Sequence, residues 1–209
     1  MRIFALLAML VGCLVAAAPA QPADLEPGSI LMFPTVDSRD GLGKGTVISV
    51  TNTNASRIVA QNNLRAGDVQ VHYYYVEGLE PFNNVFNRKE FLTPNDTLTV
   101  LAGTHNPEME VGYLLVVAED PETERAIDFD YLIGDEIIVD VAQNKLWAIP
   151  AIAFRALVAA NDLDNNGRAF TDSIANGGNA NGSVDFDGAE YDLYPDVLFI
   201  SSFFEQTSV

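Results

Sequence analysis

Cysteine is almost absent from this 209-residue chain, and histidine is scarce. The one cysteine is Cys13, and the two histidines are His72 and His105. A disulfide-stapled domain and a zinc site with several histidines are therefore excluded. Because Cys13 lies in the N-terminal signal segment described below, a thiol nucleophile and a cysteine metal site are excluded from the mature chain as well. A domain of this size can bury enough apolar surface to fold without disulfides. Because many secreted eukaryotic domains carry disulfides, their absence favours a bacterial source.

Basic residues are few as well: 11 Lys and Arg stand against 29 Asp and Glu, which gives a net charge of −18 at pH 7. So acidic a chain repels nucleic acid and anionic lipid headgroups, and no nucleic-acid partner is expected. The plausible partners are therefore cations, basic proteins and neutral polymers such as glycans. Hydrophobic residues make up 48% of the chain, enough for a sizeable core, and the length suits one domain.

The first twenty residues have the pattern of a secretory signal peptide. Arg2 is followed by the apolar run 3–18 and by the small-x-small site Ala18-Pro19-Ala20. This run is shorter than a typical transmembrane helix, so we do not expect a transmembrane protein. We expect residues 21–209 to form an extracytoplasmic domain. Residues 1–20 hold one Arg and no acid, so the mature chain keeps a net charge of about −19.

An alternative exists within the signal, because Leu10-Val11-Gly12-Cys13 also fits a bacterial lipobox. Cys13 would then be lipidated and would become the mature N-terminus, held at the cell surface by its acyl chains. Against this, residues 14–18 continue the apolar run, where a lipidated cysteine is usually followed by a polar tether. Cleavage after Ala20 is therefore favoured, and the lipoprotein remains the alternative.

Between Gly28 and Val141 the sequence reads as short strands separated by turns. In the segment 69–76, Val71, Tyr73 and Tyr75 share one face, and Gln70, His72 and Tyr74 share the other. The expected strands are 29–36, 45–52, 69–76, 88–92, 97–101, 111–118 and 127–133, with a further one over 136–141. This spacing and the abundance of Val, Thr and Tyr predict an antiparallel sandwich.

The last third differs in composition. Residues 152–161, rich in Ala, predict a short helix. Asn, Asp, Gly and Ser dominate the stretch 161–190, which we expect to be a long acidic insertion, and loops of this length are usually functional or disordered. The apolar run 196–204 is expected to pair back into the sheet as the last strand. The chain is therefore predicted to be a signal peptide, 1–20, and one mainly β domain, 21–209.

The middle of the chain, residues 45–118, resembles secreted bacterial immunoglobulin-like sandwich modules. The resemblance is carried by Thr46-Val47-Ile48-Ser49-Val50-Thr51-Asn52-Thr53-Asn54 and by Leu92-Thr93-Pro94-Asn95-Asp96-Thr97-Leu98-Thr99-Val100. In such modules a strand ending in Thr-Asn leads into a turn, and a Leu-x-Pro turn precedes another strand. The resemblance implies an immunoglobulin-like β-sandwich that binds partners or builds surfaces, and it implies no catalytic residue.

A calcium site is the best candidate site in the sequence. Asp162-Leu163-Asp164-Asn165-Asn166-Gly167 places oxygen-bearing side chains at alternate positions, with Gly where a calcium loop turns sharply. The twelfth position is Ser173 rather than Glu, so a looser site is predicted from Asp162, Asp164, Asn166 and Asp172. Asp185 and Asp187, with Glu190, would complete it or form a second half. The alternative is a solvated loop without an ion.

Three weaker candidates have simpler structural explanations. Asp128 and Asp130 share a strand face, roughly 7 Å apart by strand geometry, and paired carboxylates can hydrolyse glycosides. The wet face of a half-buried strand explains them equally well. His105 precedes Glu108 and Glu110, but a zinc site needs more ligands than these. The Val71–Tyr75 face and Trp147 could stack on sugars, although strand tyrosines usually pack in cores.

We therefore expect a secreted or cell-surface interaction module that is not an enzyme and is stabilised by calcium, with an extracellular protein or glycan as its partner. Two alternatives come from other classes. The first is a hydrolase of an extracellular glycan that uses Asp128 and Asp130 or the His105 cluster. The second is a subunit of a fibre or surface layer that assembles through strand edges, with Val197–Phe204 as its contact.

Overall fold

A computed structural model describes residues 26–39, 43–59, 66–78, 85–106, 111–157 and 169–195. These residues form a mainly β fold of two antiparallel sheets with one short helix, α2 (Ala102–His105), and a 3-10 turn, η3 (Ile174–Asn176). The strands are β1 (Ile30–Asp37), β2 (Lys44–Asn52), β3 (Val69–Glu77), β4 (Val85–Leu92), β5 (Thr97–Leu101), β6 (Val111–Glu119), β7 (Leu132–Asp140), β8 (Lys145–Pro150) and β9 (Ile152–Phe154).

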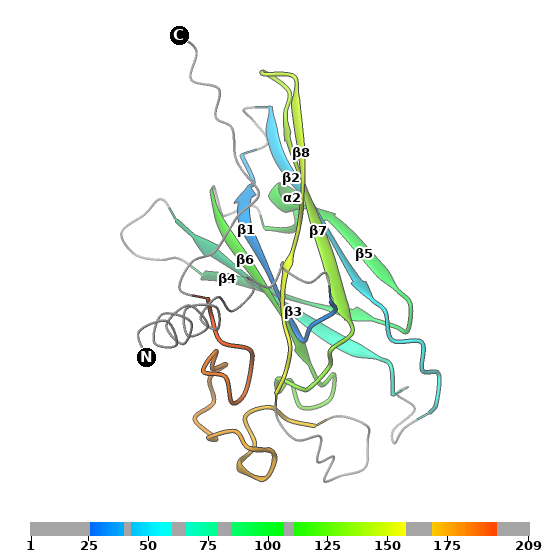
Figure 1. The fold of residues 1–209 in the computed structure, drawn as a ribbon. Coiled ribbons are helices and arrows are strands. Elements are labelled where there is room, and N and C mark those ends of the chain that lie inside the picture. Colours follow the sequence, from blue (N-terminus) through cyan, green and yellow to red (C-terminus); the bar gives the residue numbers. More distant parts are fainter. Residues whose placement is uncertain are drawn as a thin grey trace, which may run out of the picture.

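The strand order defines a five-stranded sheet, β4-β3-β6-β1-β9, and a four-stranded sheet, β5-β2-β7-β8 (Figure 1). Ala151 separates β8 from β9, so the chain passes directly from one sheet to the other at that residue. A bulge between Phe33 and Val36 interrupts the pairing of β1 with β6. The antiparallel prediction is confirmed.

The main hydrophobic core fills the space between the two sheets. Strict alternation in β3 sends Val71, Tyr73 and Tyr75 into it, as predicted, and Phe33 and Ile48 meet them from β1 and β2. Fully burying one such aliphatic or Phe side chain stabilises the fold by about 1.5–3 kcal/mol. The alternating apolar residues therefore specify both the strands and the face on which they pack.

A second apolar cluster lies on the outer face of the five-stranded sheet. Ile30 and Met32 of β1, Val117 of β6 and Phe154 of β9 point away from the main core and pack with Tyr191. Residues 169–195, which we call the cap segment, supply Tyr191 and also Val184 and Phe186. The outer face of this sheet is thus covered by a segment that has little regular secondary structure of its own.

Two secondary-structure predictions were wrong. Residues 152–154 of the predicted helix form β9, because the edge of β1 offers them backbone partners at Leu31. The predicted strand 127–133 is mostly irregular, with an isolated bridge at Ile127, and β7 begins only at Leu132. Phe129 N donates instead to Ser29 Oγ (2.7 Å) and Asp128 N to Ala169 O (2.8 Å), so side-chain and loop acceptors replace a sheet ladder.

Several predicted segments lie outside the described residues. These are the signal peptide 1–20 with Cys13, the positions Asp162, Asp164 and Asn166 of the acidic insertion, and the apolar run 196–204. In the part of the chain that the structure describes, no helix is long and apolar enough to cross a bilayer.

Candidate functional site

The outer face of the four-stranded sheet has no described segment packed on it as the cap segment packs on the other sheet. The register places Leu101, Val47, Ile137 and Ala148 side by side in one row across all four strands. We call this row and its neighbours on the same sheet surface the binding face: Leu101, Val47, Ile137, Ala148, Val139, Leu146, Ser49, Thr99, Thr51, Thr97, Ile133 and Asp135.

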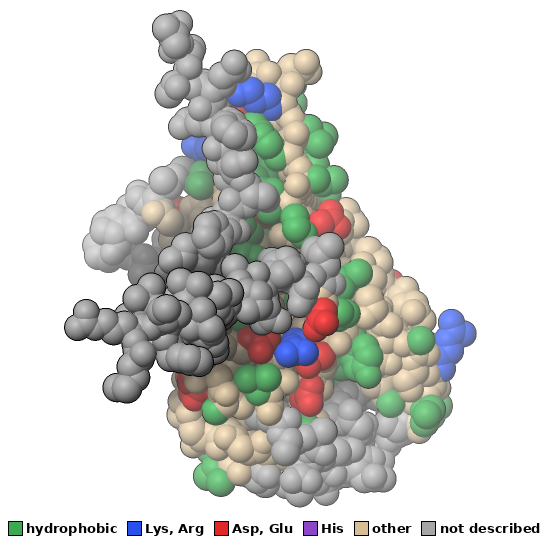
Figure 2. Space-filling model, in the orientation of Figure 1, with side chains coloured by type: hydrophobic (Ala, Val, Ile, Leu, Met, Phe, Trp, Pro, Cys, Tyr) green, Lys and Arg blue, Asp and Glu red, His purple; other side chains and the backbone are tan. Residues whose placement is uncertain are grey.

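Apolar and hydroxyl side chains dominate the binding face. Leu146 is 66% exposed, Leu101 41% and Ile133 39%. Hydroxyl groups pair across β2 and β5, with Ser49 Oγ and Thr99 Oγ1 at 3.1 Å. Figure 2 shows hydrophobic side chains gathered along the β7–β8 hairpin. A nearly uncharged strip of this kind is unusual on a protein with a net charge of −18.

The cap segment brings three acidic side chains close to one another. Glu190 is 1% exposed, and its Oε1 accepts a hydrogen bond from Asn179 N (3.0 Å). Asp172 Oδ2 accepts from Gly182 N (3.1 Å), and Asp185 Oδ2 accepts from the Asn179 side chain (2.7 Å). Burial raises the pKa of Glu190, and the charges of Asp185 and Asp172 raise it further, although Asn179 N opposes the shift.

The predicted calcium ligands are thus only partly brought together. Asp172 and Asp185 lie near each other, whereas Asp187 is exposed and accepts hydrogen bonds from Ala189 N (2.8 Å) and Glu190 N (3.1 Å). These bonds lower the pKa of Asp187 and commit its carboxylate to a turn. Among the described residues, no three His, Cys, Asp or Glu side chains form a ready-made metal site.

Asp128 and Asp130 lie at the junction between β1, the turn before β7 and the start of the cap segment. Burial raises the pKa of Asp128 to about 6, with the charge of Asp130 adding to the effect. Asp130 Oδ1 accepts hydrogen bonds from Ser29 Oγ (2.7 Å) and Ala156 N (2.9 Å). Asp130 therefore stabilises the fold by accepting these two hydrogen bonds. Asp128 is the one of the two whose pKa is raised to about 6.

Beside this junction, Arg155 is the basic residue among several acids. Its Nη1 lies 3.3 Å from Glu26 Oε2 and its Nε 3.7 Å from Asp192 Oδ2. The pairs are half-exposed, so they stabilise the fold by only about 0–1 kcal/mol each.

His105 makes buried contacts with β3 and β4, whereas the two acids that follow it in the sequence lie outside the described residues. Its Nδ1 lies 2.7 Å from Tyr75 Oη, and its Nε2 lies 3.4 Å from Glu90 Oε1. Burial lowers the pKa of His105, although Glu90 acts in the opposite direction. Glu108 and Glu110 are outside the described residues. The histidine therefore pins α2 to the buried Tyr75 of β3, which is a structural role.

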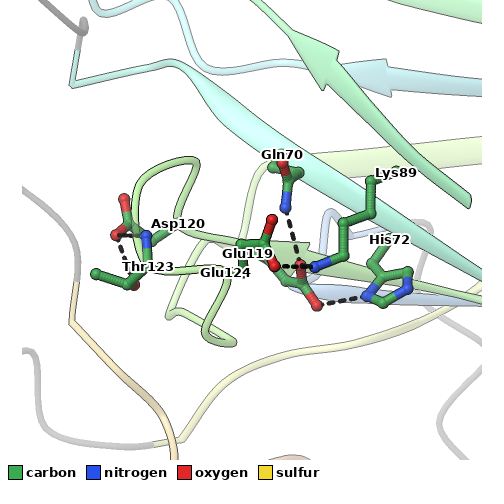
Figure 3. Close-up of polar contacts among 7 residues, drawn as sticks. All are labelled: Gln70, His72, Lys89, Glu119, Asp120, Thr123 and Glu124. Carbon is green, nitrogen blue, oxygen red and sulfur yellow. Dashed lines mark hydrogen bonds and ion pairs between the residues drawn. The ribbon is translucent and has the colours of Figure 1, made fainter.

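His72 belongs to a polar network on the outer face of β3 and β6 (Figure 3). Its Nδ1 lies 2.6 Å from Glu119 Oε1, while Gln70 Nε2 (3.0 Å) and Lys89 Nζ (3.1 Å) approach Glu119 Oε2. Burial alone would raise the pKa of Glu119, but these three partners hold it below its usual value. Lys89 also pairs with Glu124 at 3.0 Å. The network ties β3, β4 and β6 together.

A carboxyl group that belongs to no motif in the sequence lies inside the main core. Glu136 of β7 is fully buried, in register with Ile48 and Ile149, and both of its carboxyl oxygens lack a hydrogen-bond partner. Burial raises its pKa to about 8; the Thr35 backbone N–H opposes the shift, although it forms no hydrogen bond of acceptable geometry with the carboxyl group. Glu136 is therefore largely protonated at pH 7.

One small pocket of ≈ 230 Å³ lies where the chain passes between the two sheets. Its walls are Glu26, Leu31, Thr51, Ile133, Gly134, Asp135, Ala151 and Ala153. Neither Asp128 nor Trp147 lines it. It is smaller than the usual 300–1,000 Å³ range of small-molecule sites, so it does not define an active site.

Comparison with known proteins adds little. No family model matches the chain, and no curated protein matches it. The crystal structure of Thermotoga maritima 1070 is similar at a TM-score of 0.41 and 10% sequence identity, over 61% of this chain and 95% of that one. A TM-score below 0.5 supports no inference about function, so the proposals below rest on this chain's own residues.

Proposed function

We propose that this protein is an extracytoplasmic, immunoglobulin-like β-sandwich module that binds another protein through the binding face and catalyses no reaction. The observation that carries the proposal is the apolar row Leu101-Val47-Ile137-Ala148, which crosses the whole four-stranded sheet. Contiguous exposed apolar surface on a soluble domain marks interaction sites. The predicted signal peptide, with cleavage after Ala20 or a lipid anchor at Cys13, would place this face outside the cytoplasm.

The chemistry of the face indicates the kind of partner. Apolar side chains and hydroxyl pairs suit a flat protein surface with its own apolar centre. Because the rest of the chain is strongly acidic, basic side chains around that centre would speed association, and acidic ones would oppose it. We therefore expect a partner protein with an apolar contact region bordered by Lys and Arg.

Charges placed on the binding face are expected to abolish partner binding. Leu101→Glu and Leu146→Glu together would put two carboxylates into the apolar rows, at exposed positions where the fold tolerates them. We expect the double variant of residues 21–209 to lose at least about tenfold in affinity, or about 1.4 kcal/mol, for the extracellular protein that the immobilised wild type retains. Quantitative binding of that purified protein is the measurement.

The matched control carries the same charge change away from this face. Ile174→Glu and Leu193→Glu alter exposed apolar residues of the cap segment and should leave binding unchanged. Equal affinity of the face variant and the control, or no protein retained by the wild type, contradicts the proposal. Sedimentation of the wild type separates the fibre-subunit alternative, which requires assembly that grows with concentration.

A second candidate function, hydrolysis of an extracellular glycan, is favoured by one observation. The pKa of Asp128, raised to about 6 by burial and by Asp130, suits a general acid that holds its proton in mildly acidic solution. Asp128→Asn should then abolish activity on a panel of polysaccharides, and wild-type activity should fall as pH rises through about 6. Absence of activity in the wild type, or its survival in the variant, removes this candidate.

A further inference from the structure

The acidic group in the cap segment contains two carboxylate oxygens that are buried without a hydrogen-bond partner. They are Glu190 Oε2, on a side chain that is 1% exposed, and Asp172 Oδ1. The other oxygen of each carboxylate is occupied, by Asn179 N and Gly182 N respectively. Each side chain is thus held in place by a backbone N–H and leaves one oxygen free within the cluster.

No positive charge balances these acids. The cap segment, residues 169–195, contains no Lys, Arg or His. Within the described residues, no ion pair involves Asp172, Asp185 or Glu190. A buried carboxylate without a partner is costly, so it takes up either a proton or a cation. Burial raises the pKa of Glu190, and the charges of Asp185 and Asp172 add to the rise.

The residues between the acids match part of the spacing of a calcium-binding loop. Asn179, Asn181, Gly182 and Asp185 have the spacing of the third, fifth, sixth and ninth positions of a calcium loop, and Gly182 has the left-handed φ of 76° that a sharp turn at the sixth position requires. This loop lacks acids at its first and twelfth positions, where Gly177 and Gly188 stand. Asp172 and Glu190 supply the missing charges from outside it.

We propose that the cap segment binds one Ca²⁺ ion between Asp172 and Glu190, with Asp185 and the neutral oxygens of the 179–183 turn completing the ligand set. All of these donors are oxygens, and Ca²⁺ accepts six to eight oxygen ligands in flexible geometry, including amide and backbone carbonyl groups. The side chains are not yet arranged as a closed site, so binding draws the turn around the ion. The site keeps Asp172, Asp185 and Glu190 of the ligand set predicted from the sequence and does not use Asp162, Asp164 or Asn166, which lie outside the described residues.

Calcium binding is expected to hold the cap segment on the outer face of the five-stranded sheet. Phe186 and Tyr191 flank Asp185 and Glu190 in sequence and pack on Phe154 and the outer face of β1. Tyr194 Oη also reaches Met32 Sδ at 3.6 Å. An ion that fixes the acids therefore fixes the aromatic residue that follows each of them, and its binding free energy stabilises the folded cap. This inference is independent of the binding face on the other sheet.

Calorimetric titration of residues 21–209 with CaCl₂, together with melting in calcium and in chelator, tests the proposal. We expect saturable binding of one ion and a melting temperature several degrees higher in calcium. Glu190→Gln and Asp172→Asn should each weaken binding at least about tenfold. Both substitutions keep an oxygen that accepts from Asn179 N or Gly182 N. They therefore remove the negative charge and leave the local fold intact. Amide exchange at Asn179 and Gly182 should slow in calcium for the wild type alone.

Two controls make the result specific. Asp187→Asn keeps the acceptor that Ala189 N uses and should bind calcium as the wild type does. The double variant Asp162→Asn, Asp164→Asn should also keep this ion. No saturable heat with an unchanged melt, wild-type binding by Glu190→Gln, or loss of binding in the Asp162/Asp164 variant alone would each overturn the proposal. The first outcome would leave a proton as the partner of Glu190.

Discussion

Replacing Glu136 by Gln is expected to stabilise the folded protein at pH 7 by about 3 kcal/mol relative to the wild type. The carboxyl group lies in the core between Ile48 and Ile149, with no hydrogen-bond partner for either oxygen. Burial raises its pKa from 4.5 to about 8. Gln imitates the protonated carboxyl in shape and charge, so it removes the cost of keeping a proton bound at neutral pH.

The direction of the pH dependence follows from proton uptake. Between pH 4.5 and about 8 the folded state keeps the proton of Glu136, whereas the unfolded state has released it. The free energy of unfolding therefore falls by about 1.4 kcal/mol per pH unit over this window. This contribution is fully present below pH 4.5 and is lost by about pH 8. At the end of the same strand face, Asp140 pairs with Lys44 at 3.6 Å.

Urea unfolding at several pH values is the measurement. The wild type should lose stability from pH 5 to 8 more steeply than Glu136→Gln, and the difference between the two proteins should grow with pH. Asp135→Asn is the matched control, because Asp135 is the exposed neighbour on the same strand, and it should leave the slope unchanged. Parallel curves for the wild type and Glu136→Gln would show that the carboxyl group is solvated in the folded state.

Local patterns in the sequence were enough for the strands that form the main core. Alternation in β3 identifies Val71, Tyr73 and Tyr75 as one buried face because a strand has a period of two residues. The pattern failed where backbone partners rather than side chains decide the structure. Ala-rich composition predicts a helix over 152–161, yet β1 offers a free edge to Ile152–Phe154, and a tertiary partner outweighs intrinsic propensity.

The candidate sites depend on contacts between residues far apart in the chain, which no local pattern reports. Glu190 meets the turn at Asn179 only because the cap segment folds back on itself. Glu119 contacts His72 across the β3–β6 pairing. In the sequence, Glu136 looks like an ordinary strand residue, because its burial results from the packing of the two sheets. The alternation of Asp and Asn in 162–167 was a stronger signal in the sequence, although those residues lie outside the described part.

Asn52, which ends β2 in the Thr-Asn pattern noted in the sequence, is expected to be among the positions least tolerant of a charge. Its side chain is fully buried and satisfied on both sides. Nδ2 donates to Gly67 O (2.7 Å) and Thr93 O (3.0 Å), and Oδ1 accepts from Asn54 N (2.9 Å). One amide thus joins the strand end to two separate turns.

Asn52→Asp should lower the free energy of unfolding by about 3–5 kcal/mol at pH 7, because the new carboxylate would be buried against two carbonyl oxygens that have lost their donor. The loss should shrink in acid, where the carboxyl group takes up a proton and can donate to one of them. Asn54→Asp is the matched control in the same turn: Asn54 Oδ1 accepts from Ser56 N (2.8 Å), and a carboxylate keeps that role. Urea unfolding at pH 7 and pH 4 distinguishes the two. An equal loss in both variants would mean that charge anywhere in this turn is destabilising, and that the donation from Asn52 to the two carbonyls is not what holds the turns together.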